Sequence, residues 1–184
     1  MPEPQLTEPW RSFLKGLDEN LEGPIELHCF GGFVIASMHN FTRVTADVDV
    51  FQVLGAGAQS VVGLAGFGSR LHQEHKVYLD FVTVASVPDN YDTRLIRLFP
   101  EEFRHLRLMA MEAHDLVLAK LARNVDRDRE DVRRLALNGS LDVAVLKRRY
   151  DDELRYQSGW PEREDLTLQL WVEMIEEIAG YGRP

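Results

Sequence analysis

The stretch that decides the fold is residues 28–51, HCFGGFVIASMHNFTRVTADVDVF. An apolar segment precedes the glycine pair Gly31-Gly32, and near its end the stretch alternates aspartate with valine. Side chains on a strand alternate between two faces, so Asp47 and Asp49 point the same way and Val48 points the other way. Two like charges held side by side repel each other, and a divalent cation would remove that conflict. The pair therefore predicts either a metal-binding edge or a solvated strand face.

The composition is that of a globular protein. The chain has 184 residues, 45% apolar and 28% charged, which suits one domain or one core with an added lobe. Its formal net charge of −9 argues against a long nucleic-acid footprint, although local basic patches stay open. The single cysteine, Cys29, cannot form an internal disulfide, which favours a reducing compartment and a buried spectator thiol. The N-terminus lacks a signal-peptide pattern, and no apolar run reaches about 18 residues. We expect a soluble, cytoplasmic protein without membrane contact.

The first two thirds of the chain predict a mixed sheet with helices. The periodicity predicts helices at 7–21 and 33–39 and one glycine-tolerant helix within 55–75. It predicts strands at 25–30, 44–51 and 76–84, and two further strands or a hairpin at 94–99 and 103–109.

The last third predicts helices only, at 112–123, 127–137, 141–150 and 162–179. The last of these carries an apolar set at four-residue spacing, Leu166, Leu170, Met174 and Ile178. A sheet followed by helices indicates the α+β class. We expect an N-terminal helix (1–24), an α/β core (25–110) and a C-terminal helical region (111–184).

Further charged residues complete a constellation around the aspartate pair. Asp80 lies in the middle of the strand predicted at 76–84, with Tyr78 on the same face. Three carboxylates at one sheet edge can hold Mg²⁺ ions that clamp nucleotide phosphates. A glycine pair before a helix lets the backbone approach a phosphate, and Lys120 supplies a point charge for one.

This order of motifs resembles the nucleotidyltransferase fold, and more closely the AbiEii toxin group with its related small bacterial domains of unknown function. The resemblance covers roughly residues 25–137 and depends on three pieces. They are the glycine pair followed by Arg-x-Thr and Asp-x-Asp (Gly31, Gly32, Arg43, Thr45, Asp47 and Asp49), the strand carboxylate Asp80, and a lysine helix followed by Arg-Asp-x-x-Asp (Lys120, Arg127, Asp128 and Asp131). Gly32 stands where the wider superfamily usually has serine, so one hydroxyl near a phosphate is missing.

The resemblance implies an enzyme that moves a nucleoside monophosphate from an NTP to an acceptor. Asp47, Asp49 and Asp80 would hold Mg²⁺ or Mn²⁺, and Lys120 would neutralise phosphate. Gly31, Gly32, Arg43, Thr45, Arg127, Asp128 and Asp131 would line the cofactor site. The acceptor would be tRNA or a protein side chain, and the role that of a toxin with a cognate antitoxin. The alternatives are an inactive module that binds nucleotide or protein, and an interaction protein that uses helix 162–179.

Each candidate also has a structural interpretation. Lys120 could be a surface lysine whose stem covers apolar residues. Asp128 could cap a helix, and Asp131 could pair with Arg127 or Arg134 at helical spacing. Arg43 and Thr45 could orient the aspartate strand.

Overall fold

A computed structural model describes residues 4–39, 45–82 and 85–181. The chain divides into two compact units, Met1–Val84 with Leu95–Met111, and Ala85–Arg94 with Glu112–Pro184. The boundaries expected at residues 24 and 110 stay a prediction.

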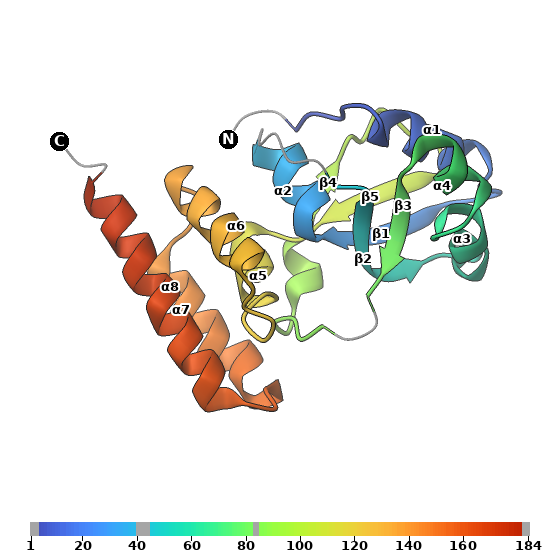
Figure 1. The fold of residues 1–184 in the computed structure, drawn as a ribbon. Coiled ribbons are helices and arrows are strands. Elements are labelled where there is room, and N and C mark those ends of the chain that lie inside the picture. Colours follow the sequence, from blue (N-terminus) through green and yellow to red (C-terminus); the bar gives the residue numbers. More distant parts are fainter. Residues whose placement is uncertain (1–3, 40–44, 83–84, 182–184) are drawn as a thin grey trace. The chain divides into compact units, whose positions relative to one another are not determined.

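The first unit contains a five-stranded sheet in the order β3-β2-β1-β5-β4 (Figure 1). Its strands are β1 (Ile25–Phe30), β2 (Asp47–Leu54), β3 (Tyr78–Phe81), β4 (Ile96–Leu98) and β5 (Leu106–Ala110). β1 pairs antiparallel with β2 and parallel with β5, while β2 pairs parallel with β3. β4 and β5 pair antiparallel, so of the two alternatives left open for this region, two further strands or a hairpin, the structure has the hairpin. The mixed sheet with packed helices confirms the α+β class.

The two faces of this sheet differ in polarity. Buried apolar side chains alternate along the strands on one face, where Cys29 lies opposite Val50 in register and both are inaccessible or nearly so. Asp47 and Asp49 lie on the other face and alternate along the strand with the buried Val48 and Val50. The alternation expected for residues 47–51 is therefore confirmed, because one-sided burial separates valine from aspartate.

The described residues of the first unit also form the helices α1 (Trp10–Glu19), α2 (Gly31–His39), α3 (Ala58–Ala65) and α4 (Arg70–His75). α2 packs on β1 and β2, α1 packs on α4, and α3 contacts α4 and β3. The apolar positions of α1 are buried, and Trp10 meets Phe33 of α2 edge-on at 5.2 Å between ring centroids. The large, fully buried side chains of this core include Phe13, Leu14, Leu17, Ile25, Leu27, Phe33, Ile35, Leu79, Leu98 and Leu108.

The prediction of a single helix within residues 55–75 is wrong. The segment forms α3 and α4, separated at residues 66–69. Gly66 leaves the helix to form a parallel bridge with Leu79, and Gly68 has a φ of +85°, which a side chain rarely adopts. Ser69 then caps α4 by accepting a hydrogen bond from the backbone N–H of His72 at 3.1 Å.

The second unit is helical. It contains η1 (Tyr91–Arg94), α5 (Ala113–Leu118), α6 (Asp126–Leu137), α7 (Val143–Arg149), the π-helix η2 (Tyr150–Leu154), η3 (Arg155–Gln157) and α8 (Pro161–Tyr181). The predicted helix 112–123 ends early because Lys120 and Leu121 bond three residues back, to Val117 and Leu118, which tightens the chain into a turn.

The apolar face predicted for the last helix is wrong in its first half. Leu166 is 56% exposed and Leu170 is 53% exposed, whereas Met174 is partly buried against the core and Ile178 is half-buried. The buried stripe of α8 instead consists of Leu168, Trp171, Val172 and Ile175, which pack with α6 and α7. Both stripes have helical spacing, and the partner helices decide which of them is covered.

Candidate functional site

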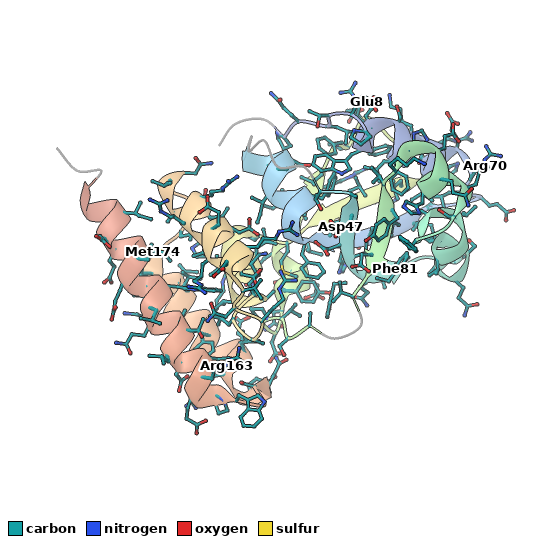
Figure 2. The ribbon with its side chains drawn as sticks, in the orientation of Figure 1. Glu8, Asp47, Arg70, Phe81, Arg163 and Met174 are labelled. Carbon is teal, nitrogen blue, oxygen red and sulfur yellow. The ribbon has the colours of Figure 1, made fainter. Side chains whose placement is uncertain are left out.

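The pairing of β2 with β3 brings the three predicted carboxylates together. Asp49 is the register partner of Asp80, and Asp47 is the partner of Tyr78. One oxygen from each of Asp47, Asp49 and Asp80 lies within 4.8 Å of the others. Figure 2 places Asp47 and Phe81 on the two neighbouring strands that carry this acidic triad. The predicted convergence of two distant segments on one sheet edge is therefore present.

Gly31 lets the triad and the start of α2 come close. Its φ is +69°, and a Cβ added there would lie 1.8 Å from Oδ2 of Asp49. Any other residue would combine a strained backbone with an overlap on that carboxylate. The conformational freedom of glycine at the β1–α2 junction thus leaves room for Asp49, while the buried Gly32 follows in the first turn of α2.

Thr45 is placed to orient the first aspartate. Its hydroxyl donates a hydrogen bond to Oδ1 of Asp47, and the backbone N–H of Asp47 lies 3.5 Å from the same hydroxyl oxygen. This contact fits the orienting role considered for Thr45. Arg43, the other residue of that motif, lies outside the described residues.

The triad has the chemistry of a site for a hard divalent cation. All three donors are carboxylate oxygens, the ligand type that Mg²⁺ and Mn²⁺ prefer. Opposite ligands of an octahedral Mg²⁺ stand about 4 Å apart, twice the usual bond length, so oxygens within 4.8 Å fit one ion after small rotations. Asp47 and Asp49 are half-buried and Asp80 is exposed, which leaves a side from which a ligand can approach.

The surroundings of the triad are electronegative. Burial and then the charges of Asp47, Asp80 and Asp49 raise the pKa of Tyr78, which shares their face of the sheet. On the opposite face, burial and the charge of Asp49 raise the pKa of the fully buried Cys29 thiol, in agreement with a spectator cysteine. A cation at this edge would offset the mutual repulsion of three neighbouring carboxylates.

A second cluster of predicted residues lies in the second unit. The Lys120 ammonium donates to Oδ1 of Asp128 at 3.1 Å and to Oδ2 of Asp131 at 2.9 Å. Lys120 is only 5% exposed, so the interpretation as a surface lysine is wrong. It follows α5 in the turn rather than lying within that helix.

Asp128 has a structural role in this cluster. It is fully buried and accepts hydrogen bonds from Lys120, Arg123 and the backbone N–H of Val125. Burial would raise its pKa, but Arg123 and Lys120 outweigh that effect and lower it. The bond to Val125 closes the N-terminus of α6, so the capping role considered for Asp128 is confirmed. Arg127, on the same helix, is exposed.

The two clusters belong to different units. The structure groups Asp47 with Asp49 and Asp80, and it groups Lys120 with Asp128 and Asp131. A joint site for both clusters stays a prediction.

Sequence reasoning missed an ion-pair network in the second unit. Asp115 is fully buried on α5 and accepts hydrogen bonds from Arg94 at 2.8 Å and from Arg149 at 2.9 Å. Arg94 also pairs with Glu153 of the π-helix, and Arg149 with Glu112. An aspartate inside the apolar run of residues 113–119 was the available signal, because a buried carboxylate requires partners.

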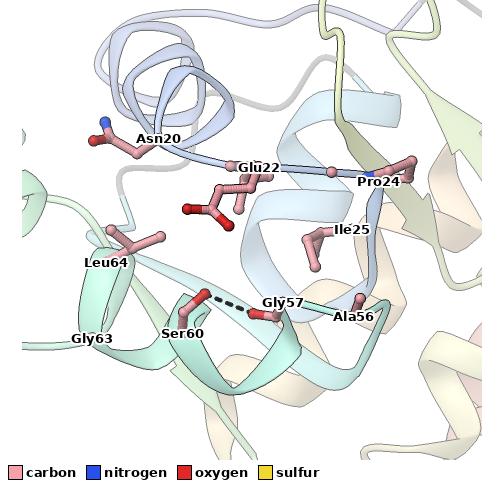
Figure 3. Close-up of a pocket in the computed structure, with 11 residues that line it drawn as sticks. Asn20, Glu22, Pro24, Ile25, Ala56, Gly57, Ser60, Gly63 and Leu64 are labelled. Atoms are coloured by element: carbon pink, nitrogen blue, oxygen red, sulfur yellow. Dashed lines mark hydrogen bonds between the residues drawn. The ribbon is translucent and has the colours of Figure 1, made fainter.

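A cavity in the first unit lies away from the triad. It has a volume of about 830 Å³ and opens beside Ile25, the first residue of β1, whereas the triad lies near the far end of that strand (Figure 3). The Ser60 hydroxyl and the Asn20 amide donate to nearby backbone carbonyls of Gly57 and Gly16. Among the described residues that line it, Glu22 alone is charged, so the cavity lacks the convergent charges of the triad.

No helix among the described residues is long and apolar enough to cross a membrane. Comparison with curated proteins and with solved structures finds no significant match. A family model matches residues 12–178, nearly the whole chain and both clusters of candidate residues. The α+β sheet that carries the acidic triad agrees with this match. The chain therefore belongs to the family described as "Nucleotidyltransferase of unknown function (DUF6036)".

Proposed function

We propose that this nucleotidyltransferase-family protein uses a divalent metal ion, Mg²⁺ or Mn²⁺, to move a nucleoside monophosphate from an NTP to an acceptor. The observation that carries the proposal is the acidic triad, three carboxylates from two separate strands with oxygens within 4.8 Å of one another. Nucleotidyl transfer needs mainly positioning and charge neutralisation, and such a cation site supplies both.

The triad residues have separate roles in this proposal. Asp47 and Asp49 hold the ion, and Thr45 keeps Asp47 in position through its hydroxyl. Asp80, the most exposed of the three carboxylates, completes the ion site or accepts the proton of the acceptor hydroxyl. When bound, the ion neutralises phosphate charge and polarises the phosphorus centre.

The reaction is an in-line displacement at the α-phosphorus. The acceptor hydroxyl oxygen forms a bond to that phosphorus, and the bond to the oxygen bridging to the β-phosphate breaks. Pyrophosphate leaves with the bonding electron pair, and the hydroxyl proton passes to Asp80 or to water. Gly31 and Gly32 present backbone N–H groups of the first turn of α2 toward the phosphates.

The second cluster has a supporting role in the proposal. Lys120 would release one of its two carboxylate partners, Asp128 or Asp131, and exchange it for a phosphate oxygen. Arg127, exposed on α6, and Arg43 would add positive charge for the triphosphate.

The acceptor and the biological role follow only from the family resemblance. We propose an RNA end, such as that of tRNA, or a protein hydroxyl as acceptor. We also propose a cytoplasmic toxin that a cognate antitoxin neutralises.

The test is transfer of label from each of the four NTPs, labelled at the α-phosphate, into total RNA and total protein. We expect transfer that depends on Mg²⁺ or Mn²⁺ and is lost in Asp49→Asn. The matched control is Asp126→Asn, because the side chain of Asp126 is 97% exposed and lies on another element. Transfer by Asp49→Asn at the wild-type rate would rule out the triad as the site. Metal-dependent NTP binding without any transfer would identify an inactive nucleotide-binding module instead.

A further inference from the structure

An exposed aromatic side chain lies beside the acidic triad. Phe67, between α3 and α4, is 79% exposed. Its neighbour Gly66 forms a parallel bridge with Leu79, so the backbone of this turn runs along the outer edge of β3 (Figure 1). Exposing a phenylalanine ring to water is unfavourable, and a large apolar side chain next to a polar site often contacts a ligand.

Two other rings hold Phe67 in place. The Phe67 and His72 rings are 4.7 Å apart between centroids and inclined by 36°, and Phe67 meets Tyr78 edge-on at 5.2 Å. His72 also meets Tyr78 edge-on at 5.1 Å. The backbone N–H of Gly68 donates to Nδ1 of His72 at 2.9 Å, which fixes the imidazole. We call Phe67, His72 and Tyr78 the aromatic cluster.

The cluster lies on the face of the sheet that carries the triad. Tyr78 is the register partner of Asp47, and it lies two residues before Asp80 on the same strand. Residues two apart on a strand point to the same face, and neighbouring strands are about 4.8 Å apart. The distance from the triad to the aromatic cluster is therefore no greater than the length of one nucleoside. A nucleotide whose phosphates bind a cation at the triad can reach the cluster with its base.

We propose that the aromatic cluster, through the exposed ring of Phe67, stacks the base of the nucleoside triphosphate whose phosphates bind at the triad. This inference rests on the proposed function, because the triad must first hold the phosphates. Every nucleobase has an aromatic face, so stacking adds affinity for all four NTPs. The larger purines gain more contact area, and we expect ATP and GTP to bind more tightly than CTP and UTP.

The experiment compares a ligand that has a base with one that has only phosphates. Dissociation constants for ATP and for inorganic tripolyphosphate, both with Mg²⁺, are measured by calorimetry for the wild type, Phe67→Ala, Phe67→Tyr and Val62→Ala. Val62→Ala is the matched control, because Val62 is also exposed and apolar and lies on the adjacent α3. A thermal unfolding scan of each variant establishes that it is folded.

We expect Phe67→Ala to weaken ATP binding about five- to tenfold and to leave tripolyphosphate binding unchanged. Phe67→Tyr keeps a stacking ring and is expected to stay within about twofold of the wild type, as is Val62→Ala. Equal weakening of both ligands, or no change in either, overturns the base-stacking proposal while the phosphate site stands. If Phe67→Ala weakens binding of an RNA acceptor but leaves ATP binding unchanged, that result also overturns the proposal.

Failure of the proposed function has a different signature. In that case the wild type shows no Mg²⁺-dependent binding of tripolyphosphate, or Asp49→Asn binds it as well as the wild type does. Either result removes the phosphate site and the stacking proposal with it.

Discussion

Replacing Gly31 by alanine tests how the fold leaves room for the acidic triad. At the φ of +69° found here, backbone strain in a residue with a Cβ destabilises the folded state by about 1–2 kcal/mol. The new Cβ would also stand 1.8 Å from Oδ2 and 2.7 Å from Cγ of Asp49. The carboxylate must rotate away from this overlap, and a side chain forced about 30° off its preferred rotamer costs a further ~0.5–1.5 kcal/mol.

The two terms together predict that Gly31→Ala lowers the free energy of unfolding by about 1.5–3.5 kcal/mol. For a chain of this length, that loss corresponds to a fall in Tm of roughly 3–14 °C. The same rotation removes Asp49 from the ion site, so we expect Mg²⁺ or Mn²⁺ affinity to fall at least about tenfold, as for losses of positioning around a metal site.

Two other glycines of the same unit separate these contributions. Gly68 has a φ of +85° but no atom within 4 Å of an added Cβ among the described residues, so Gly68→Ala carries the backbone cost alone. Gly63 lies within α3, and the space around its added Cβ is also open. Gly63→Ala is therefore expected to be neutral or stabilising by up to about 1 kcal/mol.

The assays are thermal unfolding for stability and Mn²⁺ titration for ion affinity. We expect Gly63→Ala to be the most stable variant, Gly68→Ala intermediate and Gly31→Ala least stable, with ion affinity reduced only in Gly31→Ala. Equal stability of Gly31→Ala and Gly68→Ala, with unchanged ion affinity, would refute the argument that this position must be empty for Asp49.

Three further predictions concern the second unit. Lys120→Met leaves two buried carboxylates without their ammonium, so it should lower the free energy of unfolding, measured in urea, by about 3–5 kcal/mol. The control Lys147→Met changes an exposed lysine and should lower it by less than about 0.5 kcal/mol. Comparable losses in the two variants would refute the buried pairing. Burial would raise the pKa of Glu112, but its histidine and arginine partners outweigh this and lower it from 4.5 to about 2. A lowered carboxyl pKa stabilises the folded state above the ordinary pKa, so Glu112→Gln should lose about 2 kcal/mol at pH 7, after allowance for partial exposure, and this deficit should shrink as the pH falls from about 4.5 to 2. A deficit that is constant across that range would contradict the charge argument. Trp171→Ala should cost about 3–5 kcal/mol and Leu170→Ala within about 0.5 kcal/mol, because only the former is buried; the reverse order would restore the helix face expected from the sequence.

Local chemistry fixed the elements around the triad. The alternation of aspartate and valine at 47–50 can satisfy one-sided burial only as a strand, and the glycine pair marks the entry into α2. These are short-range properties, so residue spacing was enough to predict them. The apolar pattern of residues 76–84 likewise predicted a strand with Asp80 in its middle, which made Asp80 a candidate ligand beside Asp47 and Asp49.

Spacing failed where two local solutions have similar energies. The segment 55–75 has apolar residues at helical spacing, but it divides where Gly66 bridges to β3, Gly68 takes a positive φ and Ser69 caps α4. Likewise, α8 has two apolar stripes, and spacing cannot tell which one its partners cover.

The sequence by itself determined the α+β class, the strand that carries Asp47 and Asp49, and the types of side chain available for a cation site. Only the tertiary structure decided that β3 pairs parallel with β2 so that Asp80 lies opposite Asp49, that Lys120 is buried between two aspartates, and that Phe67 is exposed next to Tyr78. The physical reason is that pairing and burial depend on contacts between residues far apart in the chain, whose energies no local pattern contains.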